Sequence, residues 1–147
     1  MDDELEVDPY REAMEKVIGV LTPLRQHRHA SAERAQHRAQ RELEAMQRQL
    51  IETQDAYVQE RQKQHDLRHT LAEENLHKSM ELSEVERWHE KERQMLDRLA
   101  FIQQDVNQQR EQIDAQRQFL EQARQTAKAQ LRAVEKLACM SETLNED

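Results

Sequence analysis

The sequence has very few of the residues that end helices, build turns or fill a globular core. It contains one Gly and two Pro, and neither residue occurs between Leu24 and Asp147. It has one Trp, two Tyr and two Phe, whereas 35% of its residues are Asp, Glu, Lys or Arg. Globular domains need more turn formers and more bulky apolar side chains. The composition therefore favours a long helix or a coiled coil and excludes most enzyme folds.

Other scarce features limit location and partners. A single cysteine, Cys139, cannot form an internal disulfide, which fits a reducing compartment. The longest apolar run, Val17–Leu24, is far shorter than the roughly 20 residues that span a bilayer. The acidic start differs from a basic signal peptide, and a net charge of -8 disfavours nucleic-acid binding. We expect a cytoplasmic protein with no membrane insertion and no nucleic-acid partner.

The most regular pattern is a heptad repeat in the second half of the chain. Steps of three and four residues from Val85 onward reach mainly apolar side chains, which is typical of a coiled-coil seam. The predicted seam comprises Val85, Trp88, Glu92, Met95, Leu99, Ile102, Val106, Gln109, Ile113, Gln116, Leu120, Ala123, Ala127, Gln130, Val134, Leu137 and Ser141.

A weaker seam runs through the first half. Its predicted members are Ala39, Leu43, Met46, Leu50, Thr53, Tyr57, Glu60, Gln64, Leu67 and Leu71. Upstream, Leu24, Arg28, Ser31 and Ala35 follow the same rhythm, but a step of four then leads to Ala39 where three is due. Such a slip predicts a stutter that locally relaxes the supercoil.

The two seams are out of phase, which predicts a corner between two helices. Continuing the first seam past Leu71 meets only polar residues, and the apolar pattern restarts at Val85. Within this gap, Ser83 and Glu86 have the spacing of a capping box, with Ser83 as the N-cap. The alternative is one uninterrupted helix of about 120 residues that dimerises through the same heptads.

We therefore predict an all-α fold, a long antiparallel two-helix coiled-coil hairpin in which residues whose numbers sum to about 159 face each other. Residues 1–16 would be an acidic disordered segment and 17–141 a single hairpin domain, followed by a flexible tail at 142–147. The helices would cover about 22–76 and 84–141, with the corner at about 77–83.

Catalytic and metal-binding signatures are weak. His65 and His69 share a helical face with Glu73, but no HExxH motif or cysteine cluster accompanies them, and solvated histidines are the simpler interpretation. One Gly excludes a glycine-rich phosphate loop. Cys139 occupies an outward heptad position without a paired His. We expect no enzyme activity, no metal and no cofactor.

Surface positions are more informative. Gln94, Arg98, Phe101 and Asp105 form one outward stripe, where an exposed aromatic side chain is either a partner contact or a harmless single apolar residue. Each predicted helix also carries a row of basic side chains at the end of the hairpin that holds the termini. These rows either bind an acidic partner or are simply a solvated face. In the first helix these are Arg25, Arg28, Arg34, Arg38 and Arg41, and in the second Arg117, Arg124, Lys128, Arg132 and Lys136.

Three features of the chain occur together: the two-helix architecture, "VLTPLRQHR" from Val20, and "LSEVERWHEKERQMLDRL" from Leu82, where Trp88 follows a polar corner. In these features the chain resembles the FliJ/YscO (SctO) family, the central stalk proteins of type III secretion systems. The resemblance covers Val17 to about Met140. It implies a stalk that enters the pore of a hexameric secretion ATPase with its paired termini, promotes ATPase assembly and activity, and reaches the export gate. The acidic start departs from the family pattern.

Residue by residue, the resemblance implies two binding sites. Contacts with the export gate would be made by Gln94, Arg98, Phe101 and Asp105. Contacts with the ATPase would be made by Leu21, Leu24, Arg25, Arg28, Arg34, Arg38, Arg117, Arg124, Lys128, Arg132 and Lys136. Two other functions stay open: a secretion chaperone or chaperone escort, and a homodimeric coiled-coil tether. The stalk interpretation expects a monomer in isolation.

Overall fold

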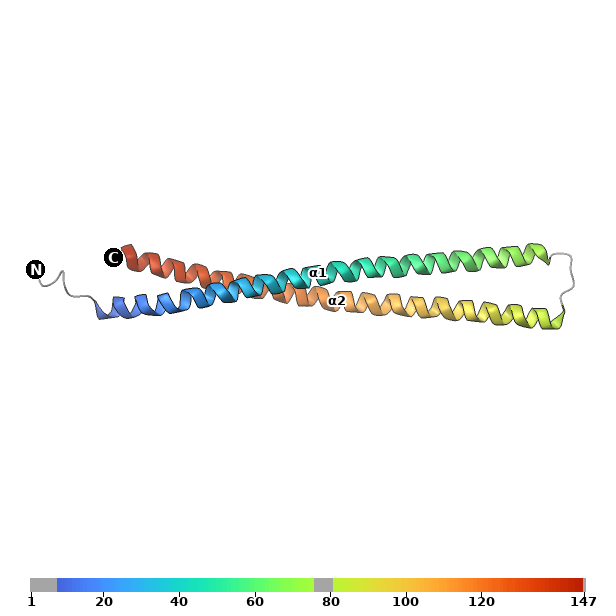
Figure 1. Ribbon diagram of the computed structural model, residues 1–147, viewed down its shortest axis with the longest axis horizontal. Coiled ribbons are helices and arrows are strands. Elements are labelled where there is room, and N and C mark those ends of the chain that lie inside the picture. The colour runs from blue at the N-terminus through green and yellow to red at the C-terminus, as the bar shows by residue number, and fades with distance from the viewer. Residues whose placement is uncertain (1–7, 76–80, 147) are drawn as a thin grey trace, which may run out of the picture. The chain divides into compact units, whose positions relative to one another are not determined.

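The computed structural model describes residues 8–75 and 81–146, and it confirms the predicted all-α helical hairpin. It has two helices, α1 (Pro9–Glu74) and α2 (Leu82–Glu146) (Figure 1). Two compact units can be distinguished. Unit 1 consists of Met1–Glu42 and Gln116–Asp147, and unit 2 consists of Leu43–Ala115. Each unit pairs a stretch of α1 with a stretch of α2.

Helix α1 begins at Pro9, which corrects both the predicted start near residue 22 and the predicted disorder of residues 9–16. Asp8 acts as the N-cap: its Oδ1 accepts a hydrogen bond from the Tyr10 amide at 3.0 Å. Proline fits the first helical position, where its missing N–H would be unpaired in any residue. The remainder of the predicted acidic segment, residues 1–7, lies outside the described residues.

Pro23 lies inside α1 and does not end it. An internal proline removes one backbone hydrogen bond and costs about 3 kcal/mol. Ile18, one turn earlier, is only 7% exposed and anchors this part of the helix in unit 1.

Helix α2 begins at Leu82, so the predicted capping box is wrong. The Glu81 carbonyl accepts hydrogen bonds from the amides of Glu84 and Val85, at 3.1 Å each. Glu81 is therefore the N-cap, and Ser83 lies within the first turn. The predicted corner at 77–83 falls mainly on residues 76–80, which are outside the described residues. The helix ends at Glu146, so residues 142–146 continue α2 rather than forming a flexible tail.

The predicted seam of α2 is confirmed along its length. Every predicted position from Val85 to Ser141 is buried or half-buried. The most buried apolar members are Val106, Ile113, Leu120, Ala127 and Leu137, each at most 6% exposed. Heptad periodicity was sufficient here because most positions carry apolar side chains.

The seam of α1 differs from the prediction upstream of Ala39. Leu24, Arg28 and Ser31 are exposed, and there is no stutter. The burial pattern instead continues the alternating steps back to Ile18 through polar as well as apolar residues. The seam positions are Ile18, Thr22, Arg25, His29, Ala32, Gln36 and Ala39, which are buried or half-buried, and the neighbouring Leu21, Ala30 and Ala35 are half-buried as well.

Contacts between the helices reproduce the predicted pairing register. In unit 1, Arg25 Nη1 donates to the Ala133 carbonyl at 3.2 Å, and Gln116 Nε2 donates to the Ala39 carbonyl at 3.1 Å. In unit 2, Gln109 Nε2 donates to Thr53 Oγ1 at 2.9 Å. These polar side chains bond across the seam and fix its register.

Candidate interaction surfaces

One exposed basic surface lies on α1 in unit 1. It is formed by Arg34, His37, Arg38 and Arg41, which line a shallow hollow. The four side chains are exposed and lie on the side of α1 away from its seam. The only acid between Leu24 and Arg41 is Glu33, whose Oε1 lies 3.3 Å from His29 Nε2. This basic surface can therefore attract an acidic partner in spite of the overall negative charge.

Arg25 and Arg124, both predicted to bind the ATPase, already form contacts inside unit 1. Arg25 is half-buried and bonds to α2, as described above. Arg124 Nη2 donates to Gln40 Oε1 at 3.2 Å, and its Nη1 lies 3.9 Å from Glu121 Oε2. These arginines contribute to the pairing of α1 with α2, so their side chains are less accessible to a partner than the prediction assumed.

The remaining predicted residues of this set divide by exposure. Leu21 is half-buried, whereas Leu24 is 41% exposed. The charged members are all exposed: Arg28, Arg34, Arg38, Arg117, Lys128, Arg132 and Lys136. On α2 of unit 1 the cations are accompanied by Glu121, Glu135, Glu142 and Glu146, so the basic character of unit 1 is concentrated on α1.

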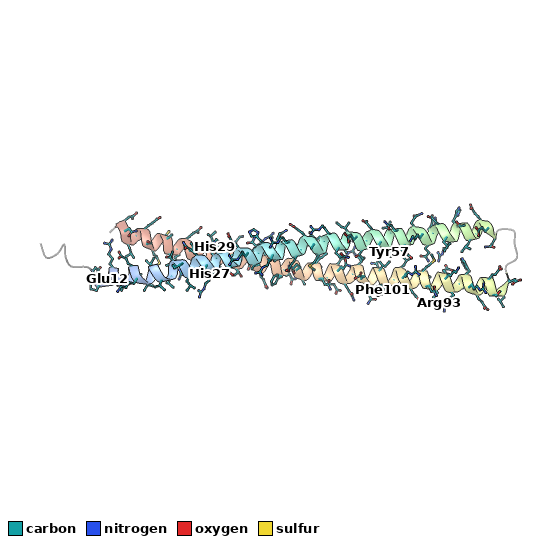
Figure 2. All side chains as sticks on the ribbon, viewed as in Figure 1. Glu12, His27, His29, Tyr57, Arg93 and Phe101 are labelled. Carbon is teal, nitrogen blue, oxygen red and sulfur yellow. The ribbon has the colours of Figure 1, made fainter. Side chains whose placement is uncertain are left out.

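Phe101 is exposed, as the heptad pattern predicts. Its side chain is 71% exposed, and Figure 2 shows it on the side of α2 away from α1, whereas Tyr57 lies toward α2. Gln94 is also exposed, but the other two predicted members of the stripe are not free outward groups. Arg98 Nη1 lies 3.3 Å from Glu60 Oε1 of α1, and Asp105 is half-buried.

Two further apolar side chains in unit 2 were not predicted. Ile51 and Val58 are 57% and 62% exposed on α1. They lie seven residues apart and therefore on one face of the helix. That spacing is visible in the sequence, but neither residue belongs to the predicted seam of the first half.

A cavity in unit 2 was also missed. It has a volume of about 210 Å³ and lies between α1 and α2, with Leu67, Leu71, Trp88 and Met95 among its lining residues. The sequence signal was the polar Gln64 at a seam position opposite Met95.

The histidine pair does not form a metal site. His69 Nε2 lies 3.1 Å from Glu73 Oε1, but both side chains are 70% exposed. Within residues 8–75 and 81–146, no group of three His, Cys, Asp or Glu side chains is arranged to hold a metal ion. Over the same residues, neither helix has an apolar stretch of the length that a bilayer requires.

The described residues form an antiparallel helical hairpin. Comparison of the chain with protein-family models, with curated proteins and with solved structures gives no match.

Proposed function

We propose that the chain is the cytoplasmic central stalk of a type III secretion system, similar to the FliJ/YscO proteins. Unit 1, which contains both ends of the described chain, would enter the central pore of the hexameric secretion ATPase and promote its assembly and activity. Helix α2 of unit 2 would bind the cytoplasmic ring of the export gate. The two-helix fold supports this proposal together with the sequence resemblance around Trp88.

The observation that carries the proposal is the basic surface of unit 1. Arg34, Arg38 and Arg41 form no ion pair with another described residue. Exposed charges that are not neutralised internally steer association with a surface of opposite sign and fix its register. An acidic ring or groove on the ATPase would complement them.

Phe101 supports the second contact. A large aromatic side chain that is 71% exposed presents apolar area which a partner can bury, and aromatic residues are enriched among binding hot spots. In this proposal, secretion chaperones are additional partners that could bind the exposed apolar surface around Phe101.

The polar seam supports a monomeric stalk. Arg25, Gln109 and Gln116 use their side chains to bond the opposite helix of the same chain. A homodimeric tether would have to replace these contacts. Sedimentation velocity of the isolated chain should show a monomer.

The ATPase contact can be tested with the full chain and the type III secretion ATPase of the same organism. The triple change Arg34→Glu, Arg38→Glu and Arg41→Glu should weaken co-purification about tenfold or more and remove stimulation of ATP hydrolysis, because it reverses the basic surface. Arg93→Glu changes an exposed cation of unit 2 and should leave both unaffected (Figure 2). Equal binding by the triple variant and the unchanged chain would refute the ATPase contact.

Phe101→Ala tests the export-gate contact. Binding to the cytoplasmic domain of the gate should fall about tenfold in a pull-down titration, whereas helicity at 222 nm should stay constant. Phe119→Ala removes another aromatic ring that is 55% exposed, but in unit 1, and it should bind normally. An unchanged affinity for Phe101→Ala would exclude this residue from the contact.

A further inference from the structure

The cavity in unit 2 has a largely apolar interior. Leu67 and Leu71 of α1 line it together with Trp88 and Met95 of α2. The ring of Trp88 makes an edge-on contact with His89, with centroids 5.1 Å apart, and this contact orients the indole. Aromatic and thioether groups adapt well to an inserted ring. The interior can therefore hold a small aromatic or alkyl group.

The cavity exists because the seam is incompletely filled at this level. Glu92 occupies a seam position, but its carboxylate forms an ion pair with Arg68 of α1 at the edge of the seam. Leu67 also occupies a seam position and is nevertheless 41% exposed. The side chains that would normally meet across a coiled coil thus leave space between them.

Gln64 supplies an unused hydrogen-bond donor at this cavity. The residue lines the cavity and is only 6% exposed, and its Nε2 is buried without a hydrogen-bond partner. Buried amide groups are nearly always paired in folded proteins, so an unpaired one calls for an explanation. A bound molecule with an acceptor oxygen would pair this amide.

The rim favours an acceptor that is negatively charged. Arg87 and Lys91 are exposed lining residues, and neither forms an ion pair with another described residue. Arg68 and Glu92 neutralise each other, which leaves Glu84 as the one remaining acid among the lining residues. The uncommitted groups therefore carry net positive charge, which complements a carboxylate.

We propose that this cavity is a binding site for a small amphipathic carboxylate, whose apolar group packs against Trp88 and Met95 while its carboxylate is bound by Gln64, Arg87 and Lys91. The same chemistry is offered by a free aryl-alkyl acid and by the C-terminal apolar residue of a polypeptide. The proposal concerns a site separate from Phe101 and from the basic surface, so it does not depend on the stalk function.

Trp88 is the only Trp of the chain, so its fluorescence reports on this site directly. Phenylbutyrate titrated into the full chain should change the emission with saturation. Phenylbutylamine has the same ring and linker with the opposite charge, and it should bind about tenfold more weakly or not at all. Absence of a saturable change, or equal binding of acid and amine, would overturn the proposal.

Variants test the individual contacts. Gln64→Leu should weaken phenylbutyrate about tenfold through loss of a hydrogen bond to a charged group. The double change Arg87→Glu and Lys91→Glu should remove selectivity for the acid over the amine. Lys128→Glu, an exposed cation of unit 1, is the matched control and should bind as the unchanged chain does. Circular dichroism of each variant verifies that helicity is retained, and full binding by both cavity variants would contradict the assigned contacts.

A second arm distinguishes the two sources of the ligand. The acetylated peptide Gly-Ser-Gly-Phe with a free C-terminal carboxylate is compared with its C-terminal amide. Tighter binding of the free peptide than of phenylbutyrate identifies a polypeptide terminus as the ligand. Binding of phenylbutyrate without the peptide identifies a free organic acid. Equal binding of the peptide and its amide would contradict carboxylate recognition.

Discussion

Units 1 and 2 share one heptad rhythm but fill it differently. In its described part, unit 1 buries five apolar side chains, among them Ala39 at 1% and Ala127 at 6% exposure. In the described part of unit 2, the buried apolar residues are Leu43, Val106 and Ile113, and the buried polar residue is Gln64. Alanines let helices approach closely, whereas Gln, Glu and Trp at seam positions keep space between them. Periodicity thus fixes which side chains face the partner helix, and side-chain size decides how tightly they pack.

The difference lies in the residues at the seam. Unit 1 buries small side chains at several seam positions and carries a basic surface on α1. Unit 2 has a cavity beside a buried polar side chain, whereas exposed apolar side chains occur in both units, for example Val20 and Phe101. A loosely filled seam costs stability, so it is a place where binding of another molecule can be favourable.

The largest effect should come from shortening a buried leucine of unit 1. Leu120 is only 3% exposed, so Leu120→Ala should lower the free energy of unfolding by about 3 kcal/mol, because the substitution leaves a cavity in a packed seam. Leu99→Ala in unit 2 should lower the free energy of unfolding by less than half of that amount, because Leu99 is half-buried and already lines a hollow. Urea unfolding followed by circular dichroism measures both, and equal losses would contradict the difference between the units.

An intermediate effect is expected where unit 2 has a buried amide without a partner. Gln64→Leu should raise the free energy of unfolding by about 1–2 kcal/mol, because it removes an unsatisfied buried amide and adds apolar contact. Gln104→Leu, at an exposed position of α2 in the same unit, serves as the control and should change little. A loss of stability in Gln64→Leu would mean that the amide is satisfied in solution.

The smallest effect concerns the ion pairs between the helices of unit 2. A double-mutant cycle on Arg68 and Glu92 should give a coupling of about 0.5 kcal/mol, because the Arg68 side chain is 48% exposed. The coupling should decline as salt is added. In unit 1, the hydrogen bond from Arg25 to the Ala133 carbonyl has a neutral acceptor. The stability lost in Arg25→Ala should therefore depend less on salt concentration. Equal salt dependence would remove this part of the comparison.

Sequence periodicity predicted α2 better than α1 for a physical reason. In α2 most seam residues are apolar, so pattern and burial coincide. In α1 between Ile18 and Ala39 the seam includes Thr22, Arg25 and Gln36. Thr22 Oγ1 donates to the Ile18 carbonyl and Arg25 Nη1 to the Ala133 carbonyl, which makes these two polar side chains acceptable at the seam. The apolar pattern alone therefore predicted Leu24 as a seam residue, although it is 41% exposed.

Helix ends and cavities were harder to predict. The start of α1 depends on one side-chain cap by Asp8, and the start of α2 uses the carbonyl of Glu81 in place of a Ser83 side chain. Exposure of Phe101 followed directly from its heptad position. The cavity did not, because its volume depends on where Glu92 and Trp88 direct their side chains.

The lone sulfhydryl of Cys139 gives the molecule a practical property. It is exposed in unit 1, and no second cysteine competes for a thiol-reactive dye. A fluorophore attached there reads events at one unit while the intrinsic indole emission reads the other. Occupancy of both regions can consequently be followed in a single cuvette without substituting any residue.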